Sequence, residues 1–197
     1  MAATTITTGQ VGTDAIAIAQ LSATGTASSS TFLRGDNSWA SPGGITLSSE
    51  QATTSGSSVT FGSIPSGTKR ITIMLEGFST GAANLHSVRI GDAGGIESSG
   101  FLACHAAAQH SSHVIATADF GFTTGTGASH RLHGVIILHL KDASNYTWIA
   151  SSIVADHTGN NDVAVGGGSK SLSAELTQVQ VLTAGTMGYG SIAINYE

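Results

Sequence analysis

From Gly44 to the end of the chain, short stretches that alternate apolar and polar residues limit the possible folds more than any other feature. In the segment 69–78, for example, Ile71, Ile73 and Leu75 are separated by single residues that are more polar. Successive side chains of a β-strand point to opposite faces, so such a segment places one face in a core. Gly-, Ser- and Asn-rich turns separate the stretches. This pattern predicts an all-β domain, an antiparallel β-sandwich of jelly-roll type.

The strand at residues 132–140 has an unusual pattern, because Val135 to Leu140 is apolar on both faces. Such a strand is either central in its sheet or covered on its second face by another subunit. The glycine-rich run 166–171 is predicted to be a turn. The expected strands cover residues 45–48, 58–64, 69–78, 86–91, 100–104, 113–122, 132–140, 146–154, 176–182 and 188–196.

Residues 1–42 differ from the β-sandwich domain expected over 43–197, and they lack the apolar mass to fold alone. We expect an extended N-terminal arm, with a short helix or a strand at 13–21. Three large apolar residues, Phe32, Leu33 and Trp39, flank a turn signal at 35–37. A flexible linker would not carry such anchors, which suggests a segment fixed to another surface, often a neighbouring subunit. The alternative is a loop that folds back on its own domain.

The run G-T-A-S-S-S-T-F-L-R-G-D-N-S-W-A-S-P, from Gly25 to Pro42, resembles a connector of bacteriophage fibre and appendage proteins. In those proteins it has the form G-T-x-S-S-S-T-F/Y-L-R-G-D-G-x-W-A-x-P, so Asn37 stands where glycine is usual. The segment from Gly166 to the closing I-N-Y-E is similar to their final hairpin. The resemblance implies a virion structural protein, made in the host cytoplasm, that forms a homotrimer. It also implies that residues 1–42 attach to other virion proteins of the capsid or tail.

The interface residues expected from the connector and from the doubly apolar strand are Phe32, Leu33, Arg34, Trp39, Val135 and Ile137. The last two support an oligomer independently of the resemblance, because their face needs a cover. Arg34 also begins an Arg-Gly-Asp tripeptide like that of integrin ligands, but the connector already accounts for those three residues.

Two functions within a virion fit these observations. A short tail or head fibre would contact host surface glycans through tip loops such as 121–129 and 157–168. A capsid cement protein, which decorates and stabilises the shell, would need no receptor. A secreted lectin-like adhesin is a third reading. It is disfavoured because residues 1–10 lack the basic region and apolar core of a secretory signal.

Composition argues against several other classes of protein. Seven Lys and Arg residues and a formal net charge of −5 disfavour nucleic-acid binding, which needs a cationic surface. No apolar run reaches the ~18 residues of a membrane span, so we expect no membrane insertion. No catalytic motif or paired carboxylates at a recognisable spacing are present, so we predict no enzyme, no catalytic residue and no cofactor. Cys104, the one cysteine, is expected to be a buried small apolar residue.

Eight histidines stand out in so weakly charged a chain. His110 and His113, like His130 and His133, are three apart, so on a strand the members of each pair point to opposite faces. His133 and His139 share a face, but they lie about 20 Å apart at ~3.3 Å per residue. We therefore predict surface or interface histidines and no metal site.

Overall fold

The structure is a computed structural model that describes residues 22–80, 85–108, 113–116, 119–122, 130–158 and 161–197. The chain divides between Gly44 and Ile45 into two units. All regular elements in the described ranges are β-strands, which confirms the predicted fold class. None of the described residues forms a helix long and apolar enough to cross a membrane. The expected helix or strand at 13–21 lies outside the described residues.

The first unit contains a small hairpin formed by the connector sequence. Its strands β1 (Phe32–Leu33) and β2 (Trp39–Ala40) are antiparallel. Asn37 lies in the turn between them with a φ of 61°, and its N–H donates to the Arg34 carbonyl at 3.0 Å. Asparagine tolerates this left-handed conformation better than most residues, so it can replace the usual glycine. The predicted turn is therefore confirmed.

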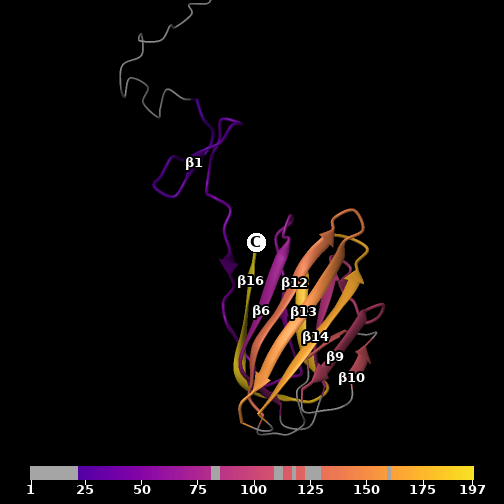
Figure 1. The fold of residues 1–197 in the computed structure, drawn as a ribbon. Helices are drawn as coiled ribbons and strands as arrows, with labels where there is room; N and C mark the ends of the chain where they lie inside the picture. Colours follow the sequence, from indigo (N-terminus) through magenta and orange to yellow (C-terminus); the bar gives the residue numbers. More distant parts are fainter. Residues whose placement is uncertain (1–21, 81–84, 109–112, 117–118, 123–129, 159–160) are drawn as a thin grey trace, which may run out of the picture. The chain divides into compact units, whose positions relative to one another are not determined.

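The second unit is built around a nine-stranded antiparallel sheet, whose longest strands lie side by side in Figure 1. The ninth strand, β4, pairs with β16 beside β3. The strands, in spatial order, are β10 (His113–Ala116), β9 (Leu102–Ala107), β14 (Asp162–Ser171), β13 (Thr147–Asp156), β12 (Leu132–Asp142), β6 (Arg70–Thr80), β16 (Met187–Tyr196) and β3 (Thr46–Leu47), with β4 at Gln51–Ala52.

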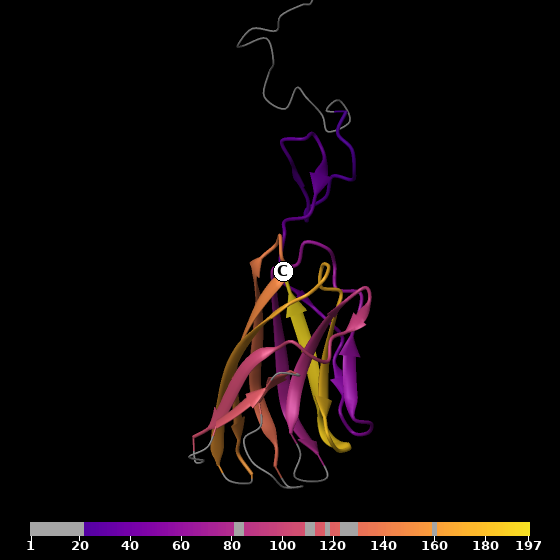
Figure 2. The same cartoon turned by 90° about the vertical axis from the view of Figure 1, so that its right-hand side faces the viewer.

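A five-stranded antiparallel sheet forms the second layer, and Figure 2 shows the two layers facing each other. Side chains from the two facing surfaces form one apolar core. The predicted β-sandwich is confirmed in this arrangement. The strands, in spatial order, are β11 (Phe120–Gly121), β7 (His86–Asp92), β15 (Gln178–Thr183) and β5 (Ser58–Phe61), with β8 (Gly95–Ile96) paired to β7.

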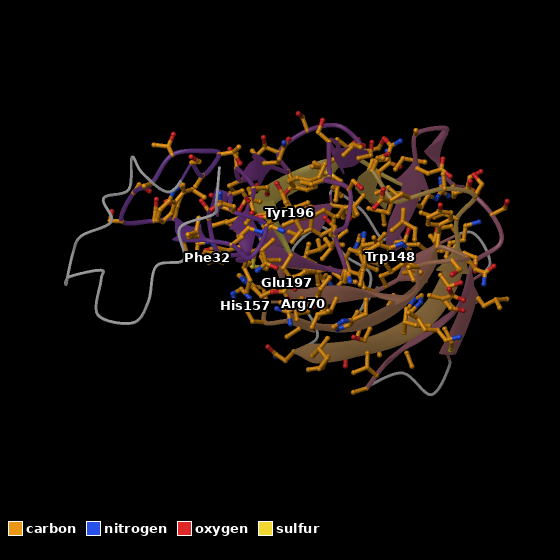
Figure 3. The ribbon with its side chains drawn as sticks, turned by 90° about the horizontal axis from the view of Figure 1, so that it is seen from above. Phe32, Arg70, Trp148, His157, Tyr196 and Glu197 are labelled. Carbon is orange, nitrogen blue, oxygen red and sulfur yellow. The ribbon has the colours of Figure 1, made fainter. Side chains whose placement is uncertain are left out.

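The alternation in the sequence assigns the core face correctly. Ile71 and Ile73 of β6 are fully buried, as are Ile192 and Ile194 of the neighbouring β16. Trp148 of β13 is also buried, and Figure 3 labels it in a view down the sandwich. A large aliphatic or aromatic side chain contributes about 1.5–3 kcal/mol on full burial. Burial at these alternating positions therefore supplies most of the favourable free energy of folding.

The glycine-rich run at 166–171 is not a turn, and this prediction was wrong. These residues belong to β14, which lies between β9 and β13 in the large sheet. The backbone of β9 passes so close that a Cβ atom on Gly168 would lie 2.6 Å from the Leu102 carbonyl oxygen. Glycine is required here by close packing within a strand. The expected tip loop at 157–168 is therefore mostly strand.

Two more expectations need correction near β9. The predicted strand 113–122 is divided between the sheets, because β10 pairs with β9 while β11 pairs with β7. The expected tip loop 121–129 begins in β11, and its residues 123–129 lie outside the described part. Cys104 is exposed, not buried, because the inward positions of β9 are those of Ala103 and His105.

The doubly apolar strand is central, which confirms one of its two explanations. β12 lies between β13 and β6, with Ile136 and Leu138 buried in the core. Val135 and Ile137 point to the opposite, outer face and are only half-buried.

Candidate functional site

The predicted anchors of the first unit keep much of their surface exposed within that unit. Phe32 and Leu33 are 48% and 38% exposed, while Trp39 is half-buried. The backbone N–H of Trp39 donates to the Thr24 carbonyl at 2.7 Å. Burial of two such neighbouring side chains requires another surface. The hairpin therefore carries two neighbouring apolar side chains that are not buried within its own unit.

The Arg-Gly-Asp tripeptide lies in the turn of this hairpin with its charged groups engaged locally. The Asp36 carboxylate accepts hydrogen bonds from the Ser38 hydroxyl at 2.6 Å and from the Ser38 N–H at 3.1 Å. The hydroxyl hydrogen bond is the main cause that lowers the pKa of Asp36. Arg34 lies 3.5 Å from the same carboxylate in an exposed ion pair. These contacts give the tripeptide a role in fixing the turn.

The outer face of the large sheet carries a band of exposed aliphatic side chains, here called the outer band. Ile153, Val165 and Leu102 are the most exposed of them, at 61%, 52% and 73%. The outward positions of β9, β13 and β14 carry no charged residue. The outer band consists of Leu102, Val135, Ile137, Ile149, Ile153, Val163 and Val165.

The strand register makes the central row of this band continuous across three strands, whereas Ser169 lies between Ile149 and Leu102. Val135 of β12 is paired with Ile153 of β13, which is paired in turn with Val165 of β14. Side chains opposite each other on one face of neighbouring antiparallel strands lie in contact range. Within the described part of residues 45–197 the small sheet packs on the inner face, so no third layer covers the outer band. The two predicted interface residues Val135 and Ile137 therefore lie at one side of a larger apolar surface.

A polar cluster closes one end of the core. His130 is buried with its Nδ1 against the Asp156 carboxylate, and its neighbour His86 is 5% exposed. Burial, followed by the proximity of His130, lowers the pKa of His86 to about 4. The His86 ring packs edge-on against Phe78 at 5.3 Å, and its Nδ1 lies 3.2 Å from the Thr183 hydroxyl. These groups stabilise the fold and reach no open cavity.

The same end of the sheet has an open depression of about 570 Å³ on its outer face. Irregular strand pairing forms it. β6 carries one extra residue around Gly77 relative to both of its neighbours, β12 and β16, and β16 carries one extra residue between Met187 and Tyr189. β-Bulges re-aim side chains and are frequent next to functional sites. His133, which lies opposite the β6 bulge, and Tyr189, which lies between the two irregularities, line the depression. The other lining residues are Glu50, Ala52, Glu76, Gly77, Arg131, Gly190 and Ser191.

Gly190 is required for this shape. Its φ is +85°, and a Cβ atom there would lie 2.3 Å from the carbonyl carbon of Gly77. β6 and β16 are thus in backbone contact at two glycines, so no side chain covers the floor of the depression there. A second depression of about 350 Å³ shares Glu50, Glu76 and Ser191 with the first and extends it as a groove along β6 and β16.

Arg131 and Tyr189 form the wall of this depression. The Arg131 guanidinium lies 3.8 Å over the centre of the Tyr189 ring. Its Nη1 donates to the Ser79 hydroxyl at 2.9 Å and to the His130 carbonyl at 3.1 Å. A stacked and hydrogen-bonded guanidinium holds its ring partner in one orientation. The Tyr189 ring is nonetheless 56% exposed, so it forms a rigid apolar platform.

His133 is also fixed in place. Its Nδ1 accepts a hydrogen bond from the Gly77 N–H at 3.3 Å, and its ring packs 4.8 Å from that of His157. A neutral imidazole that accepts at Nδ1 carries its proton on Nε2 and can donate there. His130, three residues earlier, points into the core, so the two histidines lie on opposite faces as predicted. The prediction of surface or interface positions was wrong for His86, His105 and His130, which are buried.

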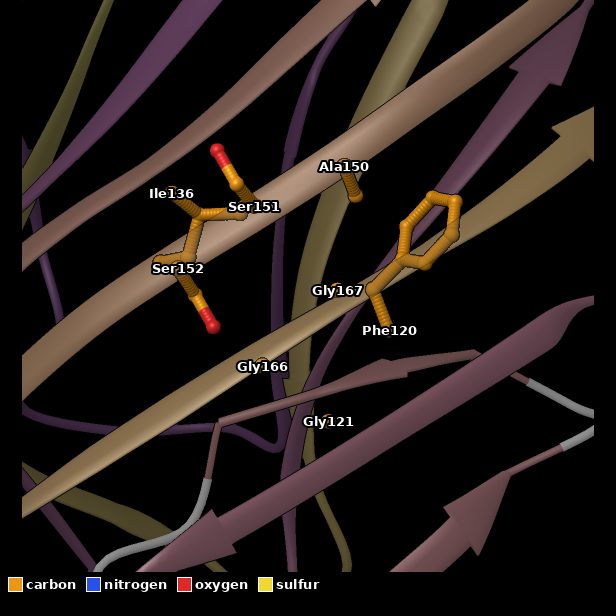
Figure 4. Close-up of a pocket in the computed structure, with 8 residues that line it drawn as sticks. All are labelled: Phe120, Gly121, Ile136, Ala150, Ser151, Ser152, Gly166 and Gly167. Atoms are coloured by element: carbon orange, nitrogen blue, oxygen red, sulfur yellow. The ribbon is translucent and has the colours of Figure 1, made fainter.

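A small internal space lies between the layers (Figure 4). Phe120, Ile136 and Ala150 line it with the glycines of β11 and β14. It admits no water molecule, so it has no room for a ligand. Among the described residues no group of three or more His, Cys, Asp or Glu side chains is placed to hold a metal ion.

No family model matches the chain, and no curated protein or solved structure is similar enough to count as a match.

The sequence predicts only two members of the outer band, Val135 and Ile137, and it predicts no residue of the depression as part of a site. The sequence marks Val135 and Ile137 because their strand is apolar on both faces, whereas Val163 and Val165 lie in the segment 157–168, which it predicts to be a tip loop. Glu50, Glu76 and Tyr189 were not singled out. Glycines inside predicted strands at Gly77 and Gly190 are the signal that could have indicated the bulges.

Proposed function

We propose that this chain is a non-enzymatic structural protein of a bacteriophage particle, a short trimeric fibre of the tail or head. In this proposal residues 1–42 attach it to other virion proteins, and the β-sandwich projects outward to contact host surface glycans. It is made in the host cytoplasm and ends in the virion. The outer band is the observation that supports this proposal best.

A continuous apolar surface of this kind is unusual on a monomer. Leu102, Ile153 and Val165 are more than half accessible, so covering each gives on the order of 1 kcal/mol, about half the value of full burial. Association also costs rotational and translational freedom, so one pair of contacts would not suffice. Three copies around a threefold axis repeat the contact three times, and closed symmetry of this type is common in oligomers.

The first unit supports attachment. The hairpin exposes Phe32 and Leu33 and holds them in strand β1, paired with β2, as a docking segment requires. We infer that Arg34 and Trp39 belong to the same interface, Arg34 at its rim and Trp39 as its anchor. Aromatic and arginine side chains are enriched in protein interfaces.

A capsid cement protein is the second candidate. The same exposed hairpin would serve to clamp a shell, and the cement function requires no ligand on the sandwich. The two candidates differ in copy number, which is hundreds per particle for cement and tens or fewer for a fibre.

The test is quantitative mass spectrometry of purified particles of the phage that encodes this sequence. We expect the chain to co-purify with particles through a density gradient at tens of copies or fewer. Hundreds of copies would favour cement over fibre, and absence from particles would refute a virion function of either kind.

A further inference from the structure

We propose that the depression lined by Glu50, Glu76, Arg131, His133 and Tyr189, here called the bulge site, binds a neutral saccharide. This inference rests on the proposed function, because it gives a place to the glycan contact of a fibre. It moves that contact away from the expected tip loops to the outer face of β6 and β16.

Irregular strand pairing gives the bulge site its hollow shape. Two irregularities converge on it, an extra residue of β6 around Gly77 and an extra residue of β16 between Met187 and Tyr189. His133, which lies opposite the first, and Tyr189, which follows the second, stand in the wall. Regular pairing would be more stable, since each bulge leaves ladder groups unpaired. Glycine backbone contact between Gly77 and Gly190 leaves an open floor. A hollow formed at such a cost is typical of a binding surface.

The exposed Tyr189 ring gives the bulge site an aromatic platform. A pyranose ring has one face lined by C–H groups, and these pack on the face of an aromatic ring. Arg131 restrains the ring before any ligand arrives, so binding would cost little additional ordering. An exposed aromatic ring held this way is suited to a flat, partly apolar ligand.

Polar groups surround the Tyr189 platform. Within the described part of the chain, the Glu50 and Glu76 carboxylates make no hydrogen bond or ion pair. Carboxylates accept strong hydrogen bonds from hydroxyl groups, and two oxygens on each can serve vicinal hydroxyls. His133 adds a donor at Nε2. Acceptors and donors thus surround an apolar platform, which matches the mixed surface of a sugar.

The charge of the bulge site selects among saccharides. Two carboxylates against one guanidinium leave it net negative when His133 is neutral. Sialic acids, uronic acids and phosphorylated sugars would be repelled, whereas neutral sugars would not. The geometry therefore favours neutral saccharides over acidic ones.

The experiment applies the full-length protein to an array of neutral and acidic saccharides and then titrates the best neutral binder by saturation-transfer NMR. We expect neutral saccharides to bind and acidic ones not to bind. Tyr189→Ala and Glu76→Gln should each weaken binding about tenfold or more, the loss expected for a stacking or charged hydrogen-bonding group. Leu85→Ala, at a residue 59% exposed and outside the bulge site, is the matched control and should bind normally.

Three results would overturn the proposal: preference for acidic saccharides, undiminished binding by both variants, or no binding of any saccharide by folded protein. Circular dichroism of each variant shows whether it is folded. If a variant fails to fold, Tyr189→Leu and Glu76→Ser replace it, because both keep a strand-compatible side chain. Copy number on particles is measured separately. A virion protein that binds no saccharide would thus refute the bulge site and leave the structural function standing.

Discussion

The stability of the sandwich should fall as the pH drops from about 6.5 towards 4, because His86 is buried as a neutral ring. Its pKa is lowered from 6.5 to about 4 by burial and by the proximity of His130. In the unfolded chain the same histidine regains its ordinary pKa, so the unfolded state binds more protons in this range. Stability is therefore full above about pH 6.5 and declines as the pH falls towards the folded-state pKa.

The size of this effect follows from the two pKa values. Each pKa unit corresponds to about 1.4 kcal/mol, so a difference of about 2.5 gives about 3 kcal/mol in total. About 2 kcal/mol of this is lost by about pH 5, since the folded ring remains neutral there while the unfolded one is protonated. Burial also lowers the pKa of His105, which adds a contribution of the same sign.

Urea unfolding at about pH 7 and about pH 5 measures the effect. His86→Phe keeps the aromatic packing against Phe78 and Phe122 but removes the titrating ring. We expect the loss of unfolding free energy between the two pH values to be about 2 kcal/mol smaller in this variant than in the wild type. His139→Gln, at an exposed position of β12, is the control and should leave the loss unchanged. An equal loss in the wild type and His86→Phe would refute the reasoning.

Three further outcomes are expected. Trp39→Ala should weaken virion attachment yet leave the unfolding transition of residues 45–197 unchanged by circular dichroism; joint unfolding would place the connector in the domain core. Gly190→Ala should lower the unfolding free energy by about 2–4 kcal/mol, because its Cβ would meet Gly77 backbone at 2.3 Å and its φ is +85°; a neutral effect would mean that the two strands separate easily. EDTA should not change the unfolding temperature, and a drop of many degrees reversed by added metal would reveal a metal site.

The sequence was sufficient to predict the class of fold and the orientation of most strands. Alternation at Ile71 and Ile73, and again at Ile192 and Ile194, marks the core face because only one face of each strand meets the other sheet. The pattern contains no information on which sheet a strand joins. For this reason one predicted strand, 113–122, turned out to be two strands in different sheets.

Glycine was the main source of error. The run in β14 was read as a turn because glycine is common in turns, but Gly168 is needed where neighbouring strands pass too closely for a side chain. The requirement depends on contacts with Leu102, more than sixty residues away, so no local pattern expresses it. The bulge site was missed for a similar reason, since Glu50, Glu76 and Tyr189 come together only through the pairing of β4, β6 and β16.

Cys104 illustrates how one position within a strand decides exposure. Its neighbours are apolar, which suggested a buried residue, yet β9 places Ala103 and not Cys104 towards the core. The stretch of β9 around Cys104 is apolar on both faces, so the sequence alone does not show which face points towards the core.

The oligomeric state of the full-length protein tests the central claim, that further copies of the chain cover the outer band. Sedimentation equilibrium at micromolar concentration should give the mass of a trimer. Ile153→Lys places a charge in the middle of the band at a residue 61% exposed, so it should yield a folded monomer. Ser58→Lys, at an exposed position of β5 in the other sheet, should remain a trimer. A wild-type monomer, or a trimer unaffected by Ile153→Lys, would contradict the account.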